Sequence, residues 1–149
     1  MLNKKKLTTI ILSGKEIPII CNLNVMEIIQ EQYVYMREGE TVLSSFQQNL
    51  GAYHYKRDEK GKIVKTAKGN PIPVDDELHI PTIKKALAWM AAEGIDIQGM
   101  EPIPEEELVR MADISPFDLA RILFVEFQGS LTRKNTEPMQ EDNPEKRKQ

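Results

Sequence analysis

The segment that most constrains this fold is an apolar helix near the end of the chain. Ser115 and Pro116 supply a cap and a proline at the first helical position, and Asp118 stands in the first turn. Apolar residues then occupy nearly every side of the predicted helix: Phe117, Leu119, Ala120, Ile122, Leu123, Phe124, Val125 and Phe127. Such a helix is expected either at the centre of a domain or as one face of an interface.

The N-terminal residues 6–21 predict a β-hairpin. Residues 7–12 are rich in β-branched side chains, and Ser13-Gly14-Lys15 follows as a turn signal. Pro18 cannot donate a backbone hydrogen bond, so the second strand is expected to be an edge or to be bulged there. An isolated hairpin is marginal in water, so this one is expected to pack against helices.

The first helix is predicted to begin after Asn24, which is a good N-cap, with Glu27 completing a variant of the capping box. Leu23 and Ile28 occupy the positions of a hydrophobic staple. Apolar residues then follow helical spacing as far as Met36, ahead of a glycine that is a plausible stop.

Three more helices complete the expected bundle around the apolar helix. A weaker one is predicted over residues 41–49, ended by Gly51, and a stronger one over 81–93, ended by Gly94. A short helix is expected to open at Pro104, because proline and the acidic residues that follow it favour a helix N-terminus.

The segment 52–78 is polar and is predicted to be an inserted, exposed hairpin with a glycine-containing turn. Tyr53, His54 and Tyr55 precede two cations, a pattern that can stack single-stranded bases, although cross-strand packing on a hairpin is the favoured interpretation. No internal repeat is apparent. The sequence therefore predicts an α+β domain over residues 1–130, in which an N-terminal hairpin packs on a small helical bundle.

Residues 131–149 are predicted to form a disordered, charged tail. Leu131 and Met139 are the large apolar residues in this stretch, and the remainder is charged, amide-bearing, Thr or Pro. So few apolar side chains cannot offset the entropy cost of ordering the segment.

Composition excludes several classes of function. The chain has 149 residues and a net charge of −3. It therefore lacks the excess of basic residues that is typical of a nucleic-acid-binding protein. Its single cysteine, Cys21, rules out an internal disulfide and suits a reducing compartment. No apolar run approaches the roughly 20 residues of a membrane span. We therefore expect a cytoplasmic protein that binds neither nucleic acid nor membrane.

The sequence offers no pattern for catalysis or for a cofactor. The two histidines, His54 and His79, do not share ligand spacing on a helix with each other or with Cys21. No phosphate-binding loop, dinucleotide fingerprint or nucleophile elbow occurs. We expect no catalytic residue, no metal site, no cofactor and no enzymatic activity.

The remaining interpretation is a protein that binds other proteins. Apolar residues of the two long helices exceed one narrow core stripe, and methionines give apolar surfaces that adapt to different partners. Trp89 falls between the predicted buried and solvent faces, so it is either core or an anchor for a partner. The predicted partner-binding residues are Trp89, Met90, Phe124 and Phe127.

Three blocks of sequence resemble the tail assembly chaperones of long-tailed phages and prophages of Gram-positive bacteria. The first block is Ile11–Ile19 running into Asn22–Ile28, the second is Leu87–Ile97, and the third is the helix opening at Ser115–Phe117 with its charged tail. The resemblance spans most of residues 7–128. It departs from the shorter members of the family in the long polar stretch after the second helix.

The resemblance implies a binding role without catalytic residues. Chaperones of this family bind the tape-measure protein, keep it soluble and recruit tail-tube subunits to polymerise around it. It further implies a location in the host bacterial cytoplasm, absence from the mature virion, and self-association as a further contact. The alternative is a structural virion component, such as a tail-tube or head–tail connector subunit. Tube subunits usually need large sheets, whereas this sequence predicts mainly helices.

Overall fold

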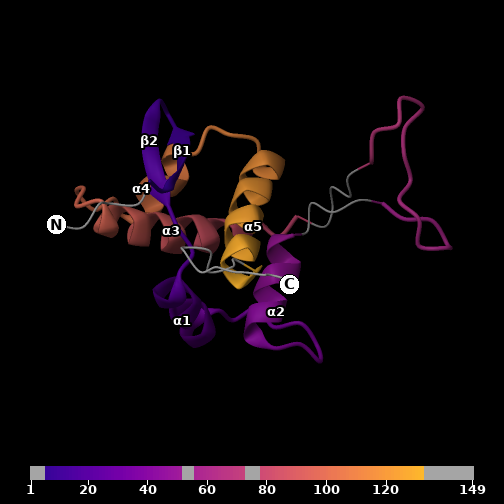
Figure 1. Cartoon of the computed structure of the whole chain (residues 1–149), viewed down its shortest axis with the longest axis horizontal. Coiled ribbons are helices and arrows are strands. Elements are labelled where there is room, and N and C mark those ends of the chain that lie inside the picture. The colour runs from indigo at the N-terminus through magenta and orange to yellow at the C-terminus, as the bar shows by residue number, and fades with distance from the viewer. Residues whose placement is uncertain (1–5, 52–55, 73–77, 133–149) are drawn as a thin grey trace, which may run out of the picture.

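The computed structural model describes residues 6–51, 56–72 and 78–132. Within these residues the chain forms an α+β fold in which one antiparallel hairpin precedes five helices, as the sequence predicts (Figure 1). The elements are β1 (Thr8–Leu12), β2 (Lys15–Ile19), α1 (Leu23–Gln32), α2 (Val42–Leu50), α3 (Ile80–Ile97), α4 (Glu105–Met111) and α5 (Pro116–Thr132).

The hairpin folds where the sequence places it. Ser13 and Gly14 both have positive φ, 51° and 79°, which is the backbone of a two-residue type I′ turn. Leu12 pairs with Lys15 next to the turn, and Ile10 pairs with Ile17 further along. Alternate residues of the two strands face inward, so the apolar side chains of this face enter the core.

The outer edge of β2 lies against α3, which explains why position 18 is a proline and position 94 is a glycine. A Cβ at Gly94 would stand 2.3 Å from the Pro18 carbonyl oxygen, so only glycine allows this approach. The edge position of β2 suits proline, because proline has no N–H to donate. The prediction that α3 ends at Gly94 is therefore wrong: the helix continues to Ile97, and the glycine serves a close contact rather than a stop.

Helix α1 begins earlier and ends earlier than its sequence signals suggest. Its N-cap is Asn22, whose side chain accepts a hydrogen bond from the Val25 N–H at 3.1 Å. Asn24 donates instead to the Glu93 carboxylate of α3, 3.0 Å away. The helix stops at Gln32 rather than near Met36, because the next residue adopts an extended conformation.

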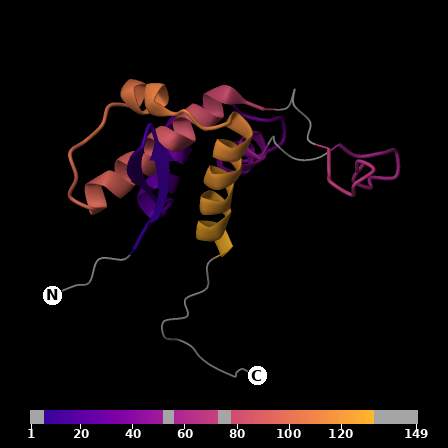
Figure 2. The same cartoon turned by 90° about the horizontal axis from the view of Figure 1, so that it is seen from above.

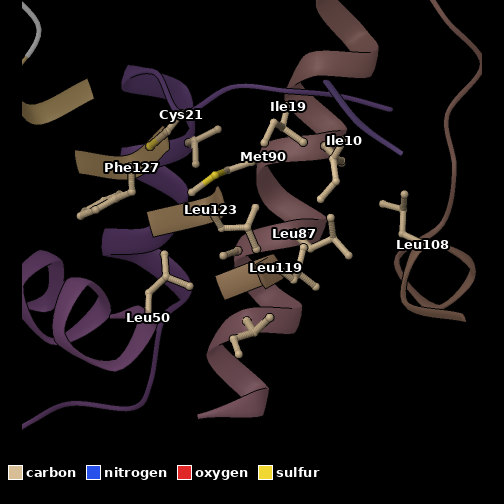
Figure 3. Close-up of a cluster of buried hydrophobic side chains, with 14 of the residues drawn as sticks. Ile10, Ile19, Cys21, Leu50, Leu87, Met90, Leu108, Leu119, Leu123 and Phe127 are labelled. Atoms are coloured by element: carbon tan, nitrogen blue, oxygen red, sulfur yellow. The ribbon is translucent and has the colours of Figure 1, made fainter. Parts of the chain in front are cut away.

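The hydrophobic core is shared by all the elements. Helix α3 lies in the middle and contacts β2 and each of the other four helices (Figures 1 and 2). Figure 3 shows side chains of the hairpin, α2, α3, α4 and α5 meeting in one cluster. Helix α5 buries one face, whereas Val125 on its opposite face is 61% exposed. The central helix is thus α3, and α5 covers one side of it.

Polar contacts join the hairpin to the later helices. The Ser13 N–H donates to the Asp113 carboxylate at 3.0 Å, just after α4. The Glu126 carboxylate of α5 accepts from the Thr8 hydroxyl at 3.1 Å and from the Cys21 N–H at 3.4 Å. These bonds fix both ends of the hairpin relative to the bundle.

Residues 56–72, named the arm from here on, contain an eight-residue repeat that was not recognised in the sequence. The first unit runs from Arg57 to Val64 and the second from Lys65 to Ile72. Gly61 and Gly69 occupy the same place in the two units, and both have φ near +80°. The repeat is hard to recognise in the sequence because the two units share little beyond the Lys-Gly pair.

The two units make equivalent hydrogen bonds. The second residue of each unit, Asp58 or Thr66, donates its N–H to the carbonyl of the sixth residue at 2.9 and 2.8 Å. The same two side chains accept from the N–H of the sixth residue, at 3.0 and 3.2 Å.

A ring of backbone bonds then closes the arm. The Lys56 N–H donates to the Ile72 carbonyl, the Ile72 N–H to the Val64 carbonyl, and the Val64 N–H to the Lys56 carbonyl. In its described part the predicted hairpin has its turn at Gly61, where Arg57 bridges to Ile63, and a second turn follows at Gly69, where Lys65 bridges to Pro71. The predicted Tyr53-His54-Tyr55 feature lies outside the described residues.

Helix α5 also runs further than the sequence suggests. It passes Gly129 and reaches Thr132. Leu131, which the sequence analysis placed in the disordered tail, therefore belongs to the helix. The rest of the predicted tail, residues 133–149, lies outside the described residues.

Candidate partner-binding surface

Two of the four predicted partner-binding residues lie in the core and not on a surface. Met90 and Phe127 have no exposed area, and Figure 3 labels both within the buried cluster. Phe127 packs against Phe46 of α2 with its ring tilted by 59° and the ring centroids 5.1 Å apart. Their assignment as partner contacts is corrected accordingly, because a partner cannot reach either side chain in this conformation.

The other two residues, Trp89 and Phe124, are half-buried and pack at the border of the core. The Trp89 ring stacks on Phe46 at a centroid distance of 6.3 Å. Phe124 covers Gly51, where an added Cβ would lie 2.8 Å from the phenyl ring. Both residues therefore stabilise the domain with part of their surface, and what remains exposed is a smaller contact area than the sequence suggested.

A more exposed apolar surface follows α1, where the sequence predicted another helical turn. Val34 is 72% exposed, Met36 50% and Tyr35 41%. The Tyr35 ring contacts the His79 ring at 4.8 Å, which brings this segment beside the N-terminus of α3 and its exposed residue Ile80. Val34, Tyr35, Met36 and Ile80 are named the apolar patch.

A network of buried polar groups holds the apolar patch in place. Asn49 of α2 donates one amide proton to the Tyr33 hydroxyl at 2.7 Å and the other to the Tyr35 carbonyl at 3.0 Å. Its amide oxygen accepts from the Arg37 guanidinium at 3.1 Å. Ser45, which is fully buried, accepts from the Arg37 N–H. Every hydrogen-bonding atom of the Asn49 amide is thus occupied, so the segment has one favoured arrangement.

The network continues to the start of α3. The Tyr33 hydroxyl lies 2.6 Å from the Thr82 hydroxyl, which lies 2.6 Å from Nδ1 of His79. When the Tyr33 and Thr82 hydroxyls both donate toward His79, its Nδ1 accepts, and the imidazole is neutral with its proton on Nε2.

Burial has the same effect on the charge of His79. Desolvation by the surrounding side chains lowers the pKa of His79 below its ordinary value of 6.5. Desolvation thus favours the neutral form of His79 at neutral pH. The apolar patch therefore borders no imidazolium charge under ordinary conditions.

An open groove lies on the opposite side of the hairpin from the core. It has a volume of about 510 Å³ and runs between the hairpin and the C-terminal end of α3, lined by Lys6, Leu7, Thr9, Glu16, Pro18, Gln98 and Met100. Its lining combines a cation, an anion and an amide with apolar groups. The apolar patch has a more uniform character, and it is the better candidate for contact with an apolar partner.

The structure brings together no metal-binding set in the regions that it describes. Among residues 6–51, 56–72 and 78–132, no three His, Cys, Asp or Glu side chains are arranged to hold a metal ion. Cys21 is buried, and His54 lies outside these ranges. No helix in the same ranges has both the length and the apolar character needed to cross a bilayer.

Sequence analysis missed the apolar patch because it expected the residues up to Met36 to belong to the first helix. The signal that could have revealed it is the pair of tyrosines flanking Val34, since tyrosines seek a hydrogen-bond partner when buried.

Comparisons of the chain with protein-family models, with curated proteins and with solved structures found no match.

Proposed function

We propose that this chain is a tail assembly chaperone, which binds the tape-measure protein of a long-tailed phage or prophage and keeps it soluble. It then recruits tail-tube subunits as the tube polymerises. The proposal joins the resemblance carried by the hairpin and the Leu87–Ile97 block to one observation: an exposed apolar patch on a segment that a buried polar network holds in place.

The arrangement of the patch suits a chaperone for apolar helices. Val34, Met36 and Ile80 present aliphatic and thioether groups, which pack against many apolar side chains without directional requirements. Because Asn49 and Ser45 hold the segment by hydrogen bonds, little conformational entropy is lost when a client binds. A tape-measure protein is long and largely helical, and it exposes apolar faces until the tube encloses it.

Co-expression tests this proposal. An affinity-tagged chain is produced with the tape-measure protein encoded in the same gene cluster, and the soluble fraction is assayed for client retained with it. We expect retention at low and moderate salt, since apolar contacts are weakly screened. The double variant Val34→Ser/Met36→Ser should retain about tenfold less client, which corresponds to losing part of the buried apolar area.

A matched control removes apolar surface elsewhere. Val125 and Leu131 on α5 are similarly exposed, at 61% and 45%, and the variant Val125→Ser/Leu131→Ser should retain the client like the wild type. Circular dichroism checks that both variants keep their helix content. If the wild-type chain fails to retain the client, or the gene cluster encodes no tape-measure protein, the chaperone proposal is wrong.

The proposed role also separates this chain from a structural virion component. A chaperone leaves the tail once assembly is complete, whereas a tube or connector subunit remains in it. Mass spectrometry of purified particles should therefore find the tape-measure protein and lack this chain. Its presence at a fixed number of copies per particle would favour the structural alternative.

A further inference from the structure

The charge of this molecule is divided between the arm and the rest of the chain. Residues 56–72 carry six Lys and Arg side chains against Asp58 and Glu59, a net charge of +4. Since the whole chain has a net charge of −3, the remaining residues carry −7. Asp75, Asp76 and Glu77 follow the arm in sequence, and short basic runs stand at residues 4–6 and 146–148. Among the described ranges the arm holds the densest run of cations, which attracts an acidic ligand.

The cations of the arm are available for a partner. They are exposed, and neither of the ion pairs seen in the described regions, Lys85 with Glu105 and Arg121 with Asp118, involves the arm. The Arg57 guanidinium donates to the Gly61 carbonyl at 2.8 Å, so the lysines are the cations that a partner can reach without breaking a bond of the arm. Asp58 forms no ion pair with these cations, and its carboxylate accepts the backbone N–H groups of Lys60 and Lys62 at 2.9 and 3.0 Å. The acid therefore shapes the turn and leaves the lysine ammonium groups free for other contacts.

The eight-residue repeat presents cations at equivalent positions. Arg57 and Lys65 open the two units, and Lys60 and Lys68 precede the two turn glycines. Figures 1 and 2 show the arm standing clear of the helices. The arm therefore presents its positive charge away from the helices.

We propose that the arm is a docking site for a short acidic segment of a partner protein. A segment with about four carboxylates matches the net charge of the arm and can bind it without crossing the rest of the molecule. A nucleic acid fits less well, because a long polyanion would approach the acidic helices. This inference does not depend on the chaperone proposal.

Fluorescence anisotropy with the full-length chain tests the inference. The probe is a labelled twelve-residue peptide with six glutamates spaced by glycine and serine, and its counterpart carries glutamine in place of glutamate. We expect the acidic peptide to bind and the glutamine peptide not to bind. Binding should weaken about tenfold or more between 50 and 300 mM salt, as screening of exposed charges requires.

Two quadruple variants locate the site. Lys60→Gln, Lys62→Gln, Lys65→Gln and Lys68→Gln together should abolish peptide binding. The control removes four exposed cations outside the arm through Lys6→Gln, Lys15→Gln, Lys84→Gln and Arg110→Gln, and it should bind within about twofold of wild type. Chemical shifts of the Gly61 and Gly69 amides, followed by NMR during the titration, provide a second readout at the turns.

Three results would overturn the inference. The first is no binding of the acidic peptide to the wild-type chain at 50 mM salt. The second is an equal loss of binding in both quadruple variants, which would mean that total charge and not the arm matters. The third is tighter binding of a twelve-nucleotide single strand or duplex of DNA than of the peptide, which would make the arm a nucleic-acid contact.

Discussion

At the contact between Pro18 and Gly94, a proline that is unfavourable in a strand and a glycine that is unfavourable in a helix together allow β2 to pack on α3. Proline weakens a strand and glycine weakens a helix by about 1 kcal/mol relative to alanine. Together they let the backbone of β2 approach α3 so closely that an added Cβ would overlap a carbonyl oxygen. The Ile20 N–H donates to the Met90 carbonyl at 3.2 Å and extends the same contact.

Gly94→Ala is therefore expected to destabilise the protein, despite the better helix propensity of alanine. The methyl group would force β2 away from α3, and overpacking of this kind costs about 1–3 kcal/mol. Urea denaturation measures the change in the free energy of unfolding. Gly51→Ala is the matched control, because its Cβ would meet the Phe124 ring, a side chain that can rotate. A Gly94→Ala protein as stable as wild type would contradict the packing argument.

Two phenylalanines of α5 are expected to differ in their contribution to stability. Phe127 is fully buried beside Phe46, so Phe127→Ala should lower the free energy of unfolding by about 3–5 kcal/mol. Phe124 is half-buried, so Phe124→Ala should cost roughly half as much. Thermal denaturation of the two variants makes the comparison, and a larger loss at Phe124 would mean that the core lies elsewhere.

His79 is expected to make stability depend on pH. Its folded-state pKa is lowered by burial, so the neutral form is favoured in the folded protein. Stability from this group is fully present above the unfolded value of about 6.5 and is lost as pH falls through the lower folded-state value. Urea denaturation between pH 7.5 and 5 should show this decline, and His79→Gln should reduce it. An unchanged decline in the variant would assign it to other groups.

Among the elements, those defined by local signals were predictable and those defined by contacts were not. The hairpin follows from its β-branched run and its Ser-Gly turn, and α2 from Thr41 and Gly51 at its ends. The start of α1 was misplaced because two asparagines can cap it. The cap is Asn22, although Asn22 and Asn24 both donate to the Glu93 carboxylate. A contact across 69 residues leaves no local mark in the sequence.

The candidate surface was harder to predict than the fold. Phe127 was predicted to contact a partner because it is aromatic. Large apolar side chains are, however, the residues most often buried in the core. Met36 fits the helical spacing predicted for the first helix, and Val34 was not singled out. Both are exposed on a segment whose Tyr35 carbonyl accepts a hydrogen bond from Asn49. Such a bond depends on how α2 packs beside α1, which periodicity alone does not specify.

The arm is expected to be separable from the rest of the fold. Its ends, Lys56 and Ile72, are joined by a backbone hydrogen bond of 2.8 Å, so a short linker can replace it without moving its neighbours. Substitution of residues 56–72 by Gly-Ser-Gly should leave the melting temperature within about 2 °C of wild type, since loop length affects stability weakly. A differential scanning calorimetry measurement showing a large drop would mean that the arm packs on the helices.

For the whole molecule, Glu126 joins the beginning of the described chain to its end. Its carboxylate bonds to Thr8 and Cys21, which lie 118 and 105 positions away in sequence. Glu126→Ala should lower the free energy of unfolding by about 1–3 kcal/mol, because it removes the acceptor for both donors. Glu126→Gln keeps one acceptor and should cost less. Equal stability of all three proteins in urea would show that the bonds are replaced by water.

The same bonds influence when the protein can fold during its synthesis. A ribosome adds roughly 5–20 residues per second, so about 6–24 s separate the emergence of Thr8 from that of Glu126. Throughout this interval the hairpin lacks the helix that fixes one of its ends, and its apolar face has no complete core to enter. We expect the nascent chain to remain sensitive to protease until α5 leaves the ribosome, and to become resistant in one late step.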